Sequence, residues 1–187
     1  PKPSTDAYAH MAIHPYPADL ETTFQLVDGR DVTIRPIRPE DAEIEQNFIR
    51  NLSDEAKYFR FMHAIHELTP EMLVRFTQID YDREMALIAV TEEDGHEVEH
   101  GVTRYVTNPD LNSCEFALVI SDEFQGHGIG QRMLKRLMEI ARSRGLDMME
   151  GEVLTANHRM LDLVRSMDFQ VERNKGNPGV EYVWKEL

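Results

Sequence analysis

Three closely spaced glycines constrain the fold of this chain more than any other feature. Gly126, Gly128 and Gly130 separate an apolar run at residues 116–120 from a segment in which apolar residues recur at helical spacing. Glycine adopts backbone conformations that are closed to other residues, and it lets a ligand approach the main chain closely. The start of a helix offers free N–H groups and the positive end of the helix dipole. The segment therefore predicts a strand, a tight turn and a helix that together bind an anion such as a diphosphate.

Two common phosphate-binding patterns do not fit this loop. The dinucleotide pattern G-x-G-x-x-G fails, because Gln131 or Met133 stands where the last glycine is required. The nucleotide P-loop fails too, because no Gly-Lys-Ser/Thr sequence follows. The pattern that fits is Gln125-x-x-Gly128-x-Gly130. A match this short also occurs in glycine-rich turns that bind nothing, so that alternative stays open at this point.

Length and composition favour one compact α/β domain in a soluble protein. The chain has 187 residues, 41% of them apolar, and no apolar run approaches the roughly 18 residues that a membrane span needs. The net charge of −14, from 20 basic and 34 acidic residues, argues against nucleic acid as a partner. The only cysteine, Cys114, cannot form an internal disulfide bond, which is compatible with the cytoplasm.

The N-terminal segment differs in character from the rest of the chain. Residues 1–25 begin with prolines and scattered polar residues and read as a linker or tail, whereas residues 26–187 carry periodic patterns typical of a folded domain. The chain starts without Met. We therefore expect that it is part of a longer protein, in which another domain precedes the tail.

The periodic segments predict a mixed order of strands and helices. Helix-capping signals occur at Ser53, Thr69 and Gly145, and Asp94-Gly95 predicts a hairpin turn. The expected strands are residues 31–37, 85–91, 98–106, 113–121, 148–154, 169–172 and 180–184. The expected helices are residues 39–52, 53–62, 69–78, 129–144 and 157–166.

The loop and four blocks around it resemble a known family. The motif Gln125-x-x-Gly128-x-Gly130 resembles the loop with which GNAT N-acetyltransferases hold the diphosphate of acetyl-CoA. Several sequence blocks are similar to Pat-type bacterial protein lysine acetyltransferases. They are HPYPADLE, DGRDVTIRPIRPEDA, IDYDREMALIAV and CEFALVISDEFQGHGIGQRML, the last followed by VLTANHRMLDLVRSMDF. The resemblance covers about residues 30–187. It implies a GNAT fold, that is, a mixed and mostly antiparallel sheet of about seven strands with helices on both faces.

The resemblance also implies a cofactor site and a substrate. Acetyl-CoA is the expected cosubstrate, with no metal ion, and the expected partner is a protein that presents a lysine, namely an acyl-CoA synthetase of the acetyl-CoA synthetase type. An acyl-CoA-synthetase-like domain often precedes the acetyltransferase domain in these proteins. The residues expected to contact the cofactor are Leu118, Val119, Ile120, Gln125, Gly126, His127, Gly128, Ile129, Gly130, Gln131 and Asn157.

Acetyl transfer to an amine needs a group that removes a proton, because a lysine ammonium has a reference pKa of about 10.4 and only the neutral amine attacks. Glu115 begins the strand that leads into the glycine loop and matches the glutamate that the Pat family uses as general base. The alternative is a strand-end glutamate in solvent. By the same resemblance, backbone N–H groups near Val119 and Ile120 are expected to stabilise the negative charge that develops on the thioester oxygen.

Three positions after the loop modify this expectation. Asn157 matches an asparagine that often contacts the cofactor, although asparagine is also a good helix N-cap. Val164 stands where many family members carry a tyrosine that protonates the leaving thiolate. We therefore assign no general acid, because the thiolate of a thiol with a pKa of about 8.5 leaves readily without being protonated by a side chain. Asp168 replaces the usual glycine before Phe169, which puts the local turn in doubt.

Other motifs are weaker candidates for chemistry. His96 and His100 are the two histidines of an H-E-x-x-H sequence, the zinc-protease motif. On a strand they would lie about 13 Å apart, too far for one metal ion. His63 and His66 are read as exposed histidines. We read Cys114 as a buried thiol that points to the face opposite Glu115.

Two further functions stay open beside protein acetylation. One is N-acetylation of a small amine, which needs an enclosed pocket, and the other is a CoA-sensing domain without catalysis. Charge adds one more expectation. An acidic patch could attract the basic segment around a target lysine, and the alternative is a solvated face without a partner. The patch consists of Asp80, Asp82, Glu84, Glu92 and Glu93.

Overall fold

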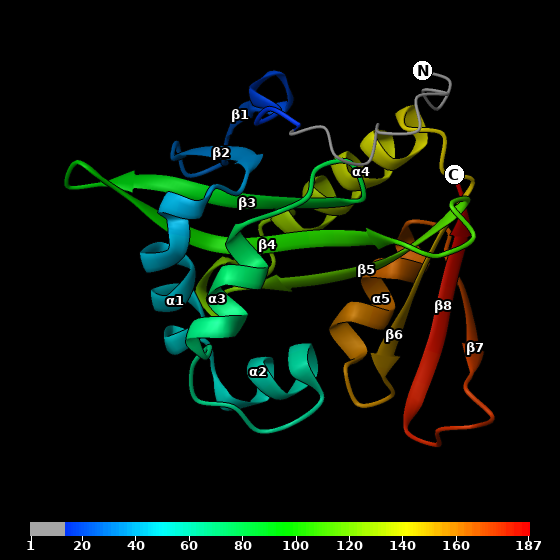
Figure 1. The fold of residues 1–187 in the computed structure, drawn as a ribbon. Coiled ribbons are helices and arrows are strands. Elements are labelled where there is room, and N and C mark those ends of the chain that lie inside the picture. Colours follow the sequence, from blue (N-terminus) through cyan, green and yellow to red (C-terminus); the bar gives the residue numbers. More distant parts are fainter. Residues whose placement is uncertain (1–13) are drawn as a thin grey trace.

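One continuous sheet organises the protein, as seen in a computed structural model that describes residues 14–187 (Figure 1). Its strand order is β1-β2-β3-β4-β5-β6-β8-β7. All neighbours are antiparallel except β5 and β6, which run parallel. The strands are β1 (Thr22–Gln25), β2 (Asp31–Pro36), β3 (Glu84–Glu93), β4 (His96–Thr107), β5 (Ser113–Ile120), β6 (Met148–Leu154), β7 (Gln170–Arg173) and β8 (Val180–Glu186).

Helices cover both faces of the sheet, as the sequence predicted (Figure 1). Ser53 and Thr69 cap α2 and α3 by accepting hydrogen bonds from Ala56 N and Met72 N, respectively, which confirms both capping predictions. At the end of α4, Gly145 N donates to Arg142 O and Leu146 N donates to Ala141 O, the paired bonds of a Schellman cap. The helices are α1 (Ala42–Asn51), α2 (Asp54–Phe61), α3 (Pro70–Thr77), α4 (Ile129–Ser143) and α5 (His158–Ser166).

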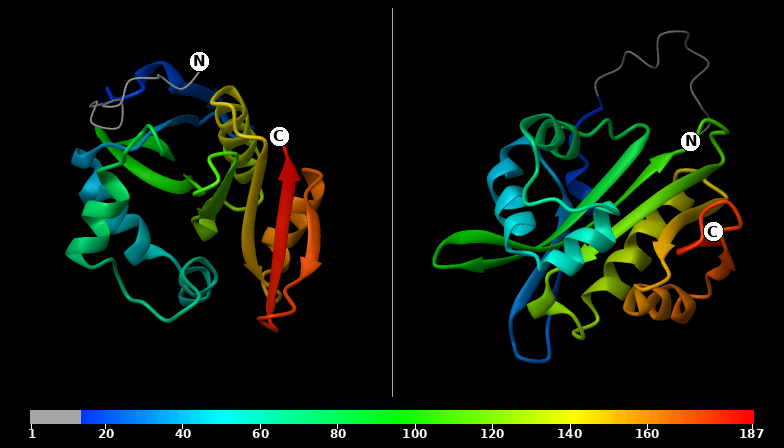
Figure 2. Two further views of the ribbon diagram at one scale, coloured as in Figure 1. Left: turned by 45° about the vertical axis from the view of Figure 1, so that its right-hand side comes forward. Right: turned by 90° about the horizontal axis from the view of Figure 1, so that it is seen from below.

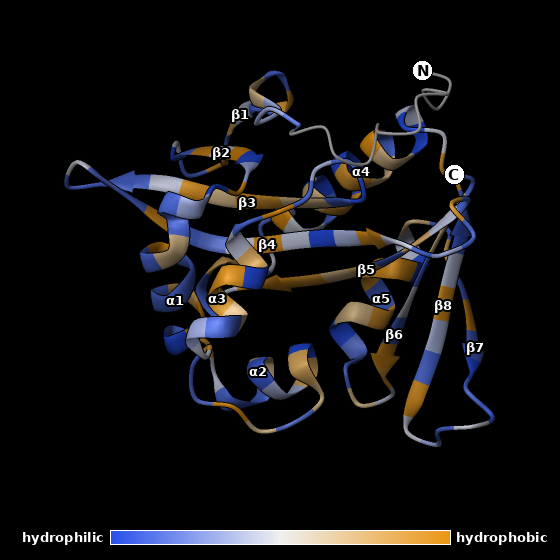
Figure 3. Ribbon diagram, in the orientation of Figure 1, coloured by the Kyte–Doolittle hydropathy of each residue, from blue (hydrophilic) through white to orange (hydrophobic). Residues whose placement is uncertain are grey.

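Two apolar cores lie on the two faces of the sheet. Alternate side chains of β5 point to opposite sides, so Phe116 and Leu118 join the core under α4 and α5, whereas Val119 joins the core under α1, α2 and α3. Figure 3 shows the apolar residues concentrated along the central strands, while the tip of the β3–β4 hairpin is hydrophilic. Within the described residues, no helix is long and apolar enough to cross a membrane.

The N-terminal region contains one strand that the sequence did not predict. Strand β1 pairs with β2 and raises the number of strands from the expected seven to eight. Its sequence, TTFQ, lacks alternating apolar residues because the strand lies at the sheet edge, where only Phe24 is partly buried. Within the expected tail of residues 1–25, a 3-10 turn (Ala18–Leu20) and β1 are thus ordered, and residues 1–13 lie outside the described part.

The two halves of the sheet separate after a short contact between β5 and β6. These strands pair only from Ser113↔Met148 to Glu115↔Glu150, and beyond that point they diverge. Figure 2 shows β6, β8 and β7 turning away from the first five strands. Phe116 fills the point of divergence, and Gly151 makes room for it, because a Cβ at Gly151 would lie 2.8 Å from the Phe116 ring. The unpaired part of β5 borders the cavities described next.

Candidate functional site

The glycine loop joins β5 to α4 in the predicted strand, turn and helix arrangement. Gly126 and Gly128 have φ angles of +85° and +77°, in the left-handed region that favours glycine. A Cβ at either position would meet no protein atom within 4 Å, so the main chain there borders open space. Gly130 differs, because its Cβ would touch the side chains of Leu163, Ile120 and Leu118. Gly126 and Gly128 thus shape the surface of the loop, whereas Gly130 allows close packing beneath it.

The start of α4 supplies the hydrogen-bond donors for an anion. The first bond inside the helix runs from Arg132 N to Gly128 O, at 3.1 Å. The N–H groups of Ile129, Gly130 and Gln131 precede it and therefore have no acceptor within the helix. These donors and the helix dipole favour a diphosphate at this position.

A cavity of about 290 Å³, here called the glycine-loop cavity, adjoins the helix start. Ten of the eleven predicted cofactor residues line it. His127 is the exception, since it is exposed and does not line this cavity. The ten residues are Leu118, Val119, Ile120, Gln125, Gly126, Gly128, Ile129, Gly130, Gln131 and Asn157.

The backbone of β5 offers free peptide groups on the side that faces away from β4. Ser121 N donates to His100 O and Asn108 N donates to Ser113 O, which fixes the alternation along the β4–β5 pair. By this alternation the N–H of Val119 bonds to Val102 and is not free to stabilise a developing oxyanion. The N–H groups of Leu118 and Ile120 point to the unpaired side instead.

A second cavity, of about 380 Å³ and here called the Glu115 cavity, lies on the α1–α3 side of the sheet. Glu115 projects from β5 on the same face as Val119. Glu84 on β3 and Glu115 flank Val106 in one row of the sheet, so their Cα atoms lie about 10 Å apart. The other lining residues are Arg60, Arg75, Phe76, Ile79, Met85, Arg104, Tyr105, Phe116 and Ala117.

The surroundings of Glu115 change the affinity of its carboxylate for a proton. Desolvation raises the pKa of Glu115 above its ordinary value of 4.5, and the carboxylates of Glu152 and Glu150 raise it further, against a smaller opposing effect of Arg60. Glu150 lies directly opposite Glu115 on β6 and accepts hydrogen bonds from Asn108 Nδ2 and Tyr182 Oη. A raised pKa brings a carboxylate closer to that of the amine whose proton it must accept.

Three residues after the loop have definite structural functions. Asn157 lines the glycine-loop cavity and also caps α5, because its Oδ1 accepts a hydrogen bond from Met160 N, at 3.2 Å. Val164 is fully buried in the core under α5, and its apolar side chain has no proton to donate to a leaving group. Asp168 has a φ of +64° and occupies the glycine position of a Schellman cap, with Phe169 N donating to Val164 O.

Sequence reasoning missed the part of the lining that comes from α2 and α5. Helix α2 lies about 60 residues before β5 in the sequence, and nothing in its own pattern indicated an approach to the loop. The i, i+3, i+6 spacing of Asn157, Met160 and Leu163 would have indicated a common face of α5. The missed residues of the glycine-loop cavity are Ala56, Phe59, Arg60, Phe124, Arg159, Met160 and Leu163.

The remaining histidine and cysteine candidates lie outside these cavities. His96 and His100 are on strand β4, as predicted, and not on a helix. His100 is buried, bonds to Thr91 Oγ1 at 2.6 Å, and has a pKa lowered by that burial. His63 and His66 are exposed. Cys114 is buried on the face opposite Glu115, as predicted, and this burial raises the pKa of its thiol to about 12.

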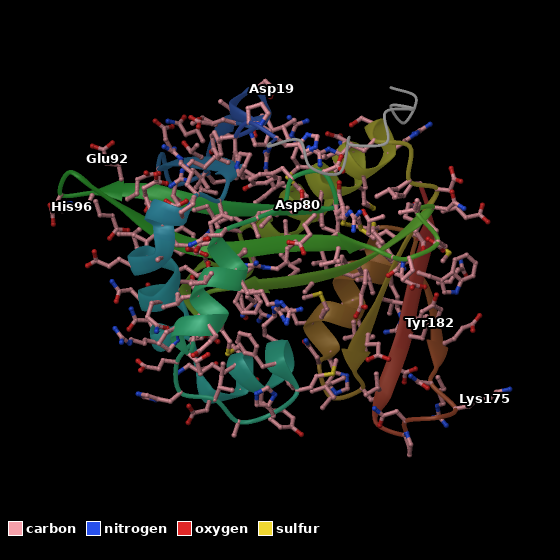
Figure 4. The ribbon with its side chains drawn as sticks, in the orientation of Figure 1. Asp19, Asp80, Glu92, His96, Lys175 and Tyr182 are labelled. Carbon is pink, nitrogen blue, oxygen red and sulfur yellow. The ribbon has the colours of Figure 1, made fainter. Side chains whose placement is uncertain are left out.

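The predicted acidic patch is divided in two by the fold. Glu84 begins β3 and Glu93 ends it, and a strand of ten residues spans roughly 30 Å. Figure 4 shows Glu92 beside His96 at the tip of the β3–β4 hairpin, far from Asp80. The prediction of one acidic patch is therefore wrong. Only Glu84 from this set lines the Glu115 cavity.

Comparison with known proteins agrees with this geometry. The model of the acetyltransferase (GNAT) domain family matches residues 31–170. An acetyltransferase of Pseudomonas aeruginosa is 38% identical over 149 residues, which are 80% of each chain. The acetyltransferase Pat of Mycolicibacterium smegmatis is 26% identical over 79% of this chain and 42% of that longer protein. The crystal structure of the GNAT domain of S. lividans PAT superposes with a TM-score of 0.84 at 29% identity, covering 92% of this chain and all of that domain.

Proposed function

Because this chain belongs to the GNAT family of acetyltransferases, we propose that it acetylates the ε-amine of a lysine on a protein substrate with acetyl-CoA as donor. The protein substrate that we expect is an acyl-CoA synthetase. Support for a protein lysine comes from the sequence blocks that resemble Pat-type enzymes and from the similarity to the GNAT domain of S. lividans PAT.

One observation carries the proposal. Strand β5 borders both cavities, with Leu118 and Ile120 at the glycine-loop cavity and Glu115 at the Glu115 cavity. A donor held on one side of this strand and an amine held on the other would therefore meet beside it. This arrangement suits direct transfer, in which both substrates are bound at once, and needs no acyl group on the protein.

The residues of the glycine-loop cavity fit acetyl-CoA. The free N–H groups at the start of α4 suit its diphosphate, and the open space at Gly126 and Gly128 lets that group approach the main chain. The free N–H groups of Leu118 and Ile120 suit an extended arm that adds to the strand edge, where the carbonyl of Ile120 already accepts a hydrogen bond from Gln125 Nε2. When bound, acetyl-CoA supplies a thioester whose carbonyl carbon accepts the amine.

Glu115 is the residue that we propose as general base. A lysine ammonium must lose a proton before it attacks, and the raised pKa of Glu115 makes its carboxylate a better acceptor than a fully solvated one. The N–H of Leu118 or Ile120, which β4 leaves free, would stabilise negative charge on the thioester oxygen. No side chain is assigned to protonate the thiolate, since Val164 is buried and a thiolate leaves readily.

Mass spectrometry of a purified acetyl-CoA synthetase, incubated with this protein and acetyl-CoA, tests the proposal. We expect one synthetase lysine to gain the mass of an acetyl group. The Glu115→Gln variant should bind acetyl-CoA normally and lose about 10²- to 10⁴-fold in kcat, the range typical of a general base.

The control is Glu139→Gln, an exposed acidic residue of α4 on the outer surface, which should leave acetylation unchanged. Normal acetyl-CoA binding without acetylation of the synthetase would contradict the proposed substrate and favour a small amine or a CoA sensor. Full activity of Glu115→Gln would contradict the assigned base.

A further inference from the structure

Arg60 stands at the junction of the two cavities. It projects from the last turn of α2 and lines the glycine-loop cavity, the Glu115 cavity and a small cavity of about 40 Å³ between β5 and β6. Among the described residues, only Arg60 lines all three cavities. Whatever occupies the meeting point of donor and acceptor is therefore next to the Arg60 guanidinium.

The guanidinium of Arg60 lacks a partner within residues 14–187. It forms no hydrogen bond or ion pair there, and the carboxylates of Glu45 and Glu115 act on it only from a distance. Two other arginines on this face are paired: Arg35 with Asp41 at 2.7 Å, and Arg104 with Glu45 at 3.1 Å. The Arg60 side chain is partly buried and lies over the ring of Phe61, with 4.9 Å from its Cζ to the ring centroid.

An unpaired cation in this position is costly for the protein. Burial, together with the positive charge of Arg104, lowers the pKa of Arg60 to about 10, so the group is still charged at neutral pH. A desolvated charge that no partner compensates destabilises the folded state. Such a residue gains its compensation when a ligand brings an anion to it.

The position of Arg60 identifies which part of the ligands it meets. The amine enters the Glu115 cavity and the thioester lies at the glycine-loop cavity, so the acyl group lies where the cavities adjoin. The proposed place of the donor's diphosphate is the start of α4, whereas Arg60 lines the same cavity from α2. The acyl group is therefore the part of the donor closest to Arg60.

We propose that Arg60 binds a carboxylate at the far end of the acyl group, so that the protein accepts dicarboxylic acyl-CoA donors such as succinyl-CoA. This inference rests on the proposed function, because it assumes that the glycine-loop cavity holds a CoA thioester. A planar guanidinium matches a carboxylate with two parallel hydrogen bonds. The carboxylate would also supply the negative charge that Arg60 lacks.

The chemistry of transfer is the same as for an acetyl group. The lysine nitrogen forms a bond to the thioester carbonyl carbon, the C–S bond breaks, and its electron pair stays with sulfur. The proton that the amine loses goes to Glu115, and solvent protonates the thiolate. The terminal carboxylate remains bound to Arg60 and does not react. The modified lysine changes from a positive to a negative charge, instead of to neutral.

Two thioethers of CoA separate this assignment from its alternatives in a binding experiment without an acceptor. S-(3-carboxypropyl)-CoA ends in a carboxylate, S-butyl-CoA has the same chain ending in a methyl group, and neither can transfer its chain. Calorimetric titration of the full chain gives the affinity of each. In Arg60→Met, we expect the affinity for the carboxypropyl compound to fall about 10- to 100-fold, and that for the butyl compound to stay unchanged. Arg60→Lys should lose less than Arg60→Met.

Arg142→Met is the matched control, because it removes the same charge from an exposed position in the last turn of α4. It should leave both affinities unchanged. If Arg60→Met lowers the affinity for both compounds equally, or for neither, Arg60 does not recognise the acyl carboxylate. Such a result is expected if Arg60 instead binds a carboxylate of the acceptor or the thioester oxygen. If the wild-type protein binds S-butyl-CoA and Arg60→Met shows no selective loss of affinity for the carboxypropyl compound, this inference is overturned and the proposed function is not. If the wild-type protein binds neither compound, the proposed function fails as well.

Discussion

The sequence around Glu115 identifies it as a candidate base, but the pKa of its carboxylate depends on residues far away in the sequence. The strand that leads into the glycine loop indicated its position in the sequence. Its pKa, however, is raised by desolvation and by Glu152 and Glu150, which lie on β6 and approach only because β5 and β6 pair at Glu115↔Glu150. Sequence reasoning could propose the base, but it could not predict which charges surround it.

The Glu152→Gln substitution tests this electrostatic effect. Protonated Glu115 cannot accept a proton, so kcat/KM should fall as the pH falls through the raised pKa of Glu115. Removing the negative charge of Glu152 lowers that pKa, and the acid limb of the pH profile should move to lower pH. Steady-state kinetics across the acid range measures the shift. Glu186→Gln, at the end of β8, should leave the limb in place, and a shift to higher pH in Glu152→Gln would contradict the argument.

Asp168 is a second residue whose surroundings explain a departure from the family pattern. With a φ of +64°, it adopts a conformation that costs non-glycine residues free energy. The Asp168→Gly substitution should therefore raise the free energy of unfolding by roughly 0.5–1 kcal/mol, whereas Asp168→Ala should lower it. Urea denaturation of the three proteins gives the order of stability. An alanine variant more stable than the glycine variant would show that the strain is absent.

At the scale of elements, β5 has two different edges. Along β4 it is paired throughout, whereas towards β6 it is paired only up to Glu115. The sequence predicted the strand from its apolar run, and the helix caps at Ser53 and Thr69 from the side chains alone, because both signals depend on near neighbours. It did not predict the divergence of β5 from β6, since that depends on how Phe116 packs at Gly151.

The Gly151→Ala substitution tests the packing at the point of divergence. A new Cβ would lie 2.8 Å and 3.1 Å from two atoms of the Phe116 ring, so the ring or the strand must move. We expect a loss of about 1–3 kcal/mol in the free energy of unfolding, typical of an overpacked core. Denaturant unfolding measures it. In Gly176→Ala, on the β7–β8 turn, the nearest atom lies at 3.5 Å, and a similar loss there would show that the packing at Gly151 is not the cause.

At the scale of the whole molecule, α2, β5, the glycine loop, the start of α4 and α5 together surround the glycine-loop cavity. Ligand binding should therefore stabilise the complete fold. Acetyl-CoA at 100 times its dissociation constant should add about 2.7 kcal/mol, which raises the Tm of a chain of this size by roughly 5–10 °C. Differential scanning calorimetry measures the shift.

The Gly128→Val variant should show little of this stabilisation, because valine is strained at a φ of +77° and its side chain enters the space beside the loop. A full shift in the variant would contradict the position assigned to the diphosphate. The shift is measured from the Tm of the ligand-free variant, so a loss of intrinsic stability is separated from a loss of binding.

The sequence by itself determined the features that depend on neighbouring residues. These are the glycine loop between strand and helix, the alternation that separates Glu115 from Cys114, and the caps of the helices, all of which follow from backbone geometry over a few residues. The tertiary structure decided the position of Arg60 between the cavities, the orientation of the Val119 N–H towards β4, and the distance between the two groups of acidic residues. These features require segments far apart in sequence to meet. The packing of the whole chain determines these contacts, because no local sequence pattern specifies which strand edge or helix end lies next to which distant segment.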